Sequence, residues 1–152
     1  MSSFRFRLQR VLALREIELS IEESALARLR LELTRLEDEL RDIHLKRDKE
    51  AEVLQAARLV AGSEIAGFAS VRTWARQQEM RLQTSLAACH RSIELRKASL
   101  MEAQRKMRLL QRLREYREAA WTCEQNRALD ELAGESAVAL WRRDADRQPA
   151  KS

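Results

Sequence analysis

The residues best suited to chemistry are His44, Cys89 and His90, because imidazole and thiolate groups are common ligands of transition metals. If the chain folds back near its middle, these three side chains come to similar heights on two paired helices. A metal site needs three or four converging ligands, and His44 and Cys89 fall at or beside different positions of the predicted helical interface. We therefore expect a cysteine in the interface and two solvated histidines, with no metal and no cofactor.

Other catalytic signatures are missing from the sequence. It has no glycine-rich phosphate loop, no nucleophile elbow and no cysteine pair at metal-binding spacing. Its many carboxylates fall on predicted solvated helix faces, where no cleft would support general acid–base chemistry. We expect no enzymatic activity.

The elements that must position these residues are two long helices. Among 152 residues there are three glycines and one proline, and two of the glycines, Gly62 and Gly67, stand close together. Because glycine and proline interrupt helices, the sequence predicts helix from Phe4 to Leu132 with a single turn near 62–70. The expected fold is all-α, a long antiparallel two-helix coiled-coil hairpin over residues 1–133. Residues 134–152 are expected to form a short helix and a disordered tail from Arg142 onward.

Heptad spacing supports the hairpin. In the first helix an unbroken apolar seam is formed by Leu26, Leu29, Leu33, Leu36, Leu40 and Ile43. The apolar stripe of Leu14, Ile17 and Ile21, which precedes this seam, is out of phase with Leu26. This change of phase indicates a point where the two helices separate or where a partner binds. The second helix continues the pattern with Leu82, Leu86, Cys89, Ile93, Arg96, Leu100, Ala103, Met107, Leu110, Arg114, Arg117 and Trp121. We expect the seam to open near Arg114 and Arg117, or these arginines to pair with acids of the first helix. Folding at the predicted turn pairs residues whose numbers sum to roughly 130.

The two helices carry opposite charge. Residues 16–52 contain twelve acids and seven bases, a net of −5, whereas residues 72–117 contain twelve bases and four acids, a net of +8. This pattern favours pairing of the two helices within one chain over binding to nucleic acid, although the whole chain has a net charge of +5. We expect a monomeric hairpin and no nucleic-acid partner.

Two groups of apolar residues are candidates for contacts. The N-terminal segment alternates them with bases: Phe4, Arg5, Phe6, Arg7, Leu8, Arg10 and Val11. It either caps the hairpin against Trp121 or docks a partner. Phe68, Val71 and Trp74 cluster at the predicted turn, where they either close the hairpin as a small core or contact a partner.

The sequence also constrains where the chain works. It has no apolar leader and no run near the ~20 apolar residues of a membrane span, so we expect a cytoplasmic protein without direct membrane insertion. Cys89 and Cys123 are 34 residues apart on one predicted helix, hence ~50 Å apart, and cannot form a disulfide within the chain.

The residues resemble those of one known family. The opening Phe4-Arg-Phe-Arg-Leu-Gln-Arg-Val-Leu-Ala-Leu-Arg-Glu16 resembles the N-terminal signature of the flagellar FliJ proteins. Two later segments are similar to that family as well: Ala103-Gln-Arg-Lys-Met-Arg-Leu-Leu-Gln-Arg-Leu-Arg-Glu-Tyr-Arg117 and Glu124-Gln-Asn-Arg-Ala-Leu-Asp-Glu131. The likeness covers residues 4–133.

The resemblance implies a component of the flagellar type III protein export apparatus, active in flagellum biogenesis and motility. By analogy with the stalk of rotary ATPases, such a protein inserts into the hexameric export ATPase and links it to the membrane export gate and to export chaperones. It would associate peripherally with the cytoplasmic face of the inner membrane at the flagellar base. The resemblance places the ATPase contact at Phe4, Arg5, Phe6, Arg7, Leu8, Arg10, Val11, Arg114, Arg117 and Trp121. By the same analogy the distal half of the hairpin, near Phe68, Val71 and Trp74, would face the export gate, but the gate-contacting positions of the family do not match this sequence residue by residue.

Three alternatives have the same broad pattern. Stalk proteins of injectisome-type secretion systems share the layout. A generic coiled-coil scaffold would associate with itself through the seam, and a basic helical hairpin would bind nucleic acid through the arginine-rich second helix.

Overall fold

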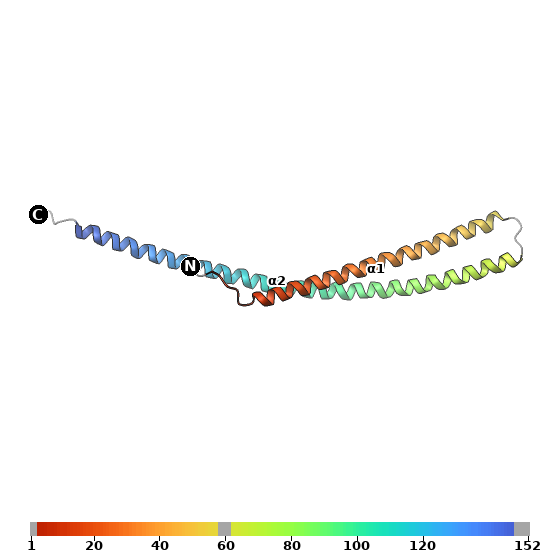
Figure 1. Cartoon of the computed structure of the whole chain (residues 1–152), viewed down its shortest axis with the longest axis horizontal. Coiled ribbons are helices and arrows are strands. Elements are labelled where there is room, and N and C mark those ends of the chain that lie inside the picture. The colour runs from red at the N-terminus through yellow and green to blue at the C-terminus, as the bar shows by residue number, and fades with distance from the viewer. Residues whose placement is uncertain (1–2, 58–61, 148–152) are drawn as a thin grey trace. The chain divides into compact units, whose positions relative to one another are not determined.

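The computed structural model describes residues 3–57 and 62–147 and contains, over these ranges, two helices and no strand. Helix α1 spans Gln9–Ala56 and helix α2 spans Gly62–Arg147 (Figure 1). The chain divides into two compact units. One, which we call the terminal unit, combines Met1–Glu16 with Arg105–Ser152, and the other, the hairpin unit, is Ile17–Gln104.

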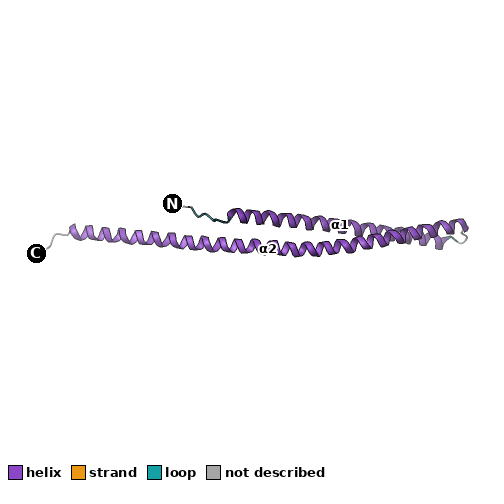
Figure 2. Cartoon of the chain, turned by 90° about the horizontal axis from the view of Figure 1, so that it is seen from below, coloured by secondary structure: helices purple, strands orange, loops and turns teal. Residues whose placement is uncertain are grey.

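The hairpin unit confirms the predicted all-α antiparallel pair. Within it, α1 and α2 run side by side in both views (Figure 1, Figure 2). Its core consists of Leu26, Leu36, Cys89 and Ile93, all buried, and the half-buried residues packed against them are Leu29, Leu33, Leu82, Leu86 and Leu100. All nine belong to the two predicted heptad series, so leucine spacing is sufficient to define the buried face of each helix.

The interface keeps one phase along the start of the hairpin unit. Four residues before Leu26 the same phase reaches Glu22, whose Oε2 accepts a hydrogen bond from Nη1 of Arg96 at 3.2 Å. The out-of-phase residues Ile17 and Ile21 are exposed, and so is Leu14 in the terminal unit. The face of α1 that meets α2 therefore continues without a shift from Leu26 to Glu22, where an ion pair takes the place of an apolar contact. Contact through Ile17 and Ile21 would require α1 to rotate about its axis.

The turn predicted near 62–70 is wrong, since Gly62–Ser70 forms the beginning of α2. Neither Gly62 nor Gly67 has a positive φ, and a Cβ atom placed on either would meet nothing within 4 Å. Their flanking sequence is rich in good helix formers, and a glycine inside a helix costs only ~1 kcal/mol. Helix α1 ends at Ala56, so the connection lies at residues 57–61, of which 58–61 fall outside the described ranges.

The pairing of residues across the interface also differs from the predicted register. Cys89 contacts Leu29 and Arg96 contacts Glu22, and in both pairs the residue numbers sum to 118 rather than roughly 130. A sum of 118 is also the sum of 56 and 62, the numbers of the last residue of α1 and the first residue of α2. Nearer the loop end His44 lies against Glu79, and these two numbers sum to 123. The contacts across the interface therefore pair residues with lower number sums than the predicted register does.

The terminal unit differs from its predicted form at both ends. Residues 4–8 are not helical, and α1 begins only at Gln9, whose backbone N–H donates to the carbonyl of Phe6 at 3.1 Å. Phe4 and Phe6 are half-buried whereas Arg5 and Arg7 are exposed, a period of two that suits an extended segment. Leu12, only 2% exposed, is the first well-buried residue of α1.

The predicted short helix and disordered tail at 134–152 are also wrong as far as the structure describes them. Helix α2 continues through Gly134 to Arg147, because Gly134 is flanked by good helix formers and no atom crowds its Cα. Residues 148–152 lie outside the described ranges. From Asn126 to Arg147 every side chain of α2 is exposed.

Candidate functional site

The terminal unit contains a cavity of about 410 Å³, which we call the terminal cavity. It is formed by the extended N-terminal segment lying against α2, and its lining residues are Phe4, Arg5, Phe6, Arg7, Leu8, Leu113 and Arg117. Phe4 is held by Trp121, with ring centroids 6.1 Å apart and planes tilted by 51°. An aromatic pair of this geometry stabilises a contact beyond its buried area, by ~1 kcal/mol.

Apolar walls and basic groups share this cavity. Phe4, Phe6, Leu8 and Leu113 supply the apolar surface, and no acidic residue lines the cavity. The guanidinium groups of Arg5, Arg7 and Arg117 have no ion pair or side-chain hydrogen bond among the residues that the structure describes. An apolar hollow with three unneutralised guanidinium groups is chemically suited to bind a ligand that is both apolar and anionic.

Six of the ten predicted ATPase-contact residues come together here, namely Phe4, Arg5, Phe6, Arg7, Leu8 and Arg117. A seventh, Trp121, packs on Phe4, so the predicted capping of the hairpin by this segment is confirmed for that pair. Arg10, Val11 and Arg114 are exposed and do not line the cavity. Arg117, like Arg114, is exposed.

Leu113 is the lining residue that the heptad analysis missed. It lies beside Arg114 and off the phase that contains Leu110, so the coiled-coil pattern assigns it to the solvated face. The available signal was its spacing of four from Arg117, which puts both residues on one face of α2.

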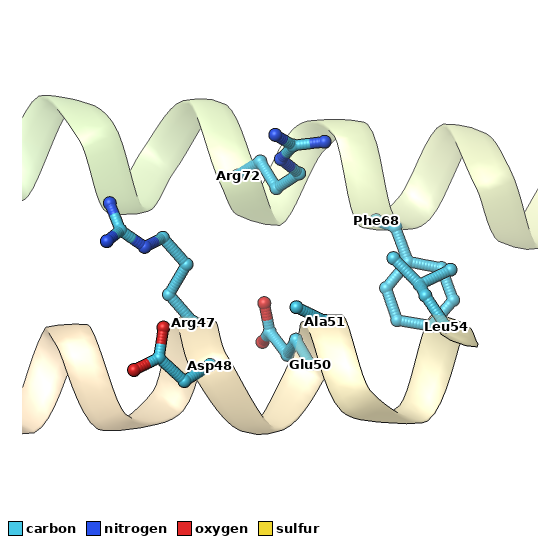
Figure 3. A pocket seen from close by; sticks show the side chains of 7 residues that line it. All are labelled: Arg47, Asp48, Glu50, Ala51, Leu54, Phe68 and Arg72. Atoms are coloured by element: carbon cyan, nitrogen blue, oxygen red, sulfur yellow. The ribbon is translucent and has the colours of Figure 1, made fainter. Parts of the chain in front are cut away.

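A second region of interest lies at the loop end of the hairpin unit. A cavity of about 210 Å³ opens between the helices there, lined by Arg47, Asp48, Glu50, Ala51, Leu54, Phe68 and Arg72. Figure 3 shows Phe68 of α2 beside Leu54 of α1, while Arg47 and Glu50 point from α1 toward α2. A neighbouring cavity of about 430 Å³ is lined by Arg47, Ala69, Arg72, Thr73, Arg76 and Glu79. We call these two the loop-end cavities.

The predicted cluster of Phe68, Val71 and Trp74 is not a closed core. Phe68 is half-buried and lines a loop-end cavity, whereas Val71 is exposed and Trp74 is 51% exposed, and neither lines that cavity. The three residues are spaced by three along one helix, which distributes them over about 120° of its surface. Of the three, only Phe68 lines the cavity between the helices.

The chemically active side chains do not converge. His44 is half-buried rather than solvated as predicted, and its Nε2 lies 3.0 Å from Oε1 of Glu79. The other carboxylate oxygen of Glu79 accepts a hydrogen bond from Nη1 of Arg47 at 3.4 Å. Cys89 is buried and His90 exposed, and Cys89 and Cys123 are free thiols. In the described ranges no three His, Cys, Asp or Glu side chains are placed to hold a metal ion.

No described helix contains an apolar stretch of the length needed to cross a membrane. Comparisons with known proteins found no matching family model, no matching curated protein and no matching solved structure. The likeness to flagellar FliJ proteins accordingly stays an expectation drawn from residues 4–16, 103–117 and 124–131.

Proposed function

We propose that this chain is a component of the flagellar type III protein export apparatus that inserts into, or regulates, the hexameric export ATPase. It would contact the ATPase through the terminal unit and link it to the membrane export gate and to export chaperones. The work would take place in the cytoplasm, at the inner face of the membrane.

One observation carries the proposal. Two of the segments that resemble the FliJ family, residues 4–16 and all but the first two residues of 103–117, belong to the terminal unit and form one cavity with Leu8, Leu113 and Arg117 among its walls. Segments that lie about a hundred residues apart in the sequence and share a family pattern thus make a common surface.

The charge of that surface supports the same proposal. Arg5, Arg7 and Arg10 are exposed on the terminal unit, and such a basic surface would be steered into a ring whose lumen is acidic. The proposed gate contact, at Phe68, Val71 and Trp74, lies in the hairpin unit beside the loop-end cavities. The two proposed contacts therefore use different units of the chain.

ATP hydrolysis by the cognate export ATPase, titrated with this protein, tests the proposal. Insertion into a sixfold ring predicts stimulation that saturates near about one chain per six ATPase subunits. Replacing Arg5, Arg7 and Arg10 by Glu should abolish stimulation. The matched control replaces Arg28, Arg30 and Arg81, which are exposed in the hairpin unit, and alters the net charge equally. Absence of stimulation and of co-migration by the unmodified chain would contradict the proposal.

A generic coiled-coil scaffold is the second candidate. The observation that favours it is the exposed stretch of α2 after Asn126, which includes Leu129, Leu132 and Leu140. Apolar side chains that are solvated in one chain can be buried by pairing with a second copy. Sedimentation equilibrium distinguishes the candidates, because the scaffold predicts a stable dimer and the export component a monomer.

A further inference from the structure

We propose that the terminal cavity binds an acidic segment of a partner protein, with one large apolar side chain entering the cavity and neighbouring carboxylates contacting Arg5, Arg7 and Arg117. The inference rests on the proposed function in taking the terminal unit as the partner-facing part of the chain. It adds the chemical class of the segment that the cavity binds, which the proposed function does not specify.

The size and the apolar walls of the cavity favour a ligand with an apolar side chain. At about 410 Å³ it is near the lower end of the ~300–1,000 Å³ typical of ligand pockets, enough for one or two large side chains. Its walls include Leu8 and Leu113, both of which remain more than a third exposed, and the half-buried Phe6. Covering this surface removes apolar area from water at ~25 cal/mol per Å², which is the main source of affinity.

The arginines around the terminal cavity favour a negatively charged ligand. Arg5 and Arg7 alternate with Phe4 and Phe6 along the extended segment, so their guanidinium groups stay exposed while the rings turn inward. Arg117 completes the rim from α2. A guanidinium group matches a carboxylate through two parallel hydrogen bonds. Because each exposed pair contributes at most ~1 kcal/mol, the arginines supply selectivity for acidic segments more than affinity.

A protein segment fits this site better than a nucleic acid does. Because Phe4 packs against Trp121, the cavity offers a base at most one aromatic ring, that of Phe6, on which to stack. The aliphatic walls formed by Leu8 and Leu113 also offer no hydrogen bonds to base edges.

A membrane surface fits less well, since membrane-binding segments present apolar side chains on the outer face of an amphipathic helix. Here residues 4–8 are not helical, and their apolar side chains line a hollow.

The test is an NMR titration of the full-length protein, with labelled leucine methyl groups and arginine Nε–Hε groups. The probes are eight-residue peptides in which Leu, Phe or Trp is flanked by Asp and Glu. We expect saturable shifts at Leu8, Leu113 and Arg117. Peptides with Ser in place of the apolar residue, or with Gln and Asn in place of the acids, should give none.

Matched variants locate the site. Leu113→Ala should weaken peptide binding about tenfold, as the loss of ~1.4 kcal/mol of apolar contact requires. Leu109→Ala, one turn earlier on α2 and outside the cavity, should leave binding unchanged. Arg117→Gln should weaken binding about threefold and flatten its salt dependence, as for a solvated ion pair. Arg112→Gln, on another face of α2, should do neither.

Three results would overturn the inference: no shifts with any acidic peptide, equal losses in the control variants, or tighter binding to a single-stranded oligonucleotide or to phosphatidylglycerol vesicles. ATPase stimulation by the same protein separates this inference from the proposed function. Stimulation without peptide binding refutes only the cavity's role, and peptide binding without stimulation refutes only the export assignment.

Discussion

The thiol of Cys89 donates a hydrogen bond to the backbone carbonyl of Leu29 at 3.5 Å, across the interface of α1 and α2. A side chain that reaches the main chain of the facing helix indicates close approach of the two backbones. The pair lies among the buried residues Leu26 and Ile93 and defines the register of the hairpin unit.

This relationship predicts a specific cross-link. In a Cys123→Ser background, Leu29→Cys should form a disulfide with Cys89 on mild oxidation, because the Cys89 sulfur already lies 3.5 Å from the backbone carbonyl of Leu29. Arg41→Cys is the matched control, since it would face Cys89 only if paired residue numbers summed to 130. Tryptic mapping under non-reducing conditions identifies the linked peptides. A cross-link from position 41 instead of 29 would refute the register.

Burial in the hairpin core predicts unequal effects of one substitution at two sites of α1. Leu36 is 6% exposed and Leu31 is 73% exposed. Leu36→Ala should lower the free energy of unfolding by ~2 kcal/mol, the low end for buried leucines, because a two-helix interface can partly collapse around the gap. Leu31→Ala should change it by less than ~0.5 kcal/mol. Urea unfolding followed by circular dichroism measures both, and equal effects would place the interface on another face.

The helical setting of Gly67 predicts a gain in stability. Since its φ is not positive and an added Cβ would meet no atom within 4 Å, Gly67→Ala should stabilise the protein by ~0.5–1 kcal/mol. Gly134→Ala should act in the same direction for the same reason. Thermal unfolding provides the measurement. A loss of stability at position 67 would instead indicate the turn that the glycine spacing suggests.

The contact between Phe4 and Trp121 predicts a spectroscopic change. In a background with Trp74 and Trp141 replaced by Phe, Trp121 is the sole reporter. Phe4→Ala should shift its emission to longer wavelength, because the indole loses its aromatic neighbour and gains water. Phe68→Ala, in the hairpin unit, should leave the emission unchanged. An unshifted spectrum for Phe4→Ala would show that the N-terminal segment does not stay on α2 in solution.

One ion pair of α1 predicts a pH effect. Nε of Arg35 donates to Oε2 of Glu32 at 3.0 Å, and this hydrogen bond holds the pKa of Glu32 below its usual value of 4.5. Because the folded-state pKa is the lower one, the pair stabilises α1 above pH 4.5 and loses its effect as the pH falls through the lowered pKa.

Arg35→Gln should raise the pKa of Glu32 toward 4.5, which carboxyl-carbon NMR titration would detect. Arg41→Gln, whose partner is Asp38, should leave the pKa of Glu32 unaltered. An unchanged titration in Arg35→Gln would mean that the pair does not form in solution.

The sequence by itself determined the helical class and the buried faces. Leucines at spacings of three and four identify Leu26, Leu36 and Ile93 as interface residues, because side-chain direction in a helix follows from position alone. That rule did not predict the contact of Phe4 with Trp121, because Phe4 precedes the helix and follows no helical spacing.

Only the tertiary structure decided the register and the cavity. Whether Gly67 ends a helix depends on energies of ~1 kcal/mol, which packing elsewhere along two long helices easily outweighs. Because α1 ends at Ala56 and α2 begins at Gly62, Cys89 lies against Leu29 and Arg96 against Glu22 instead of their predicted partners. The terminal cavity likewise arises because residues 4–8 are not helical and lie with Phe6 and Leu8 in one cavity with Leu113, and heptad spacing contains no information about that contact.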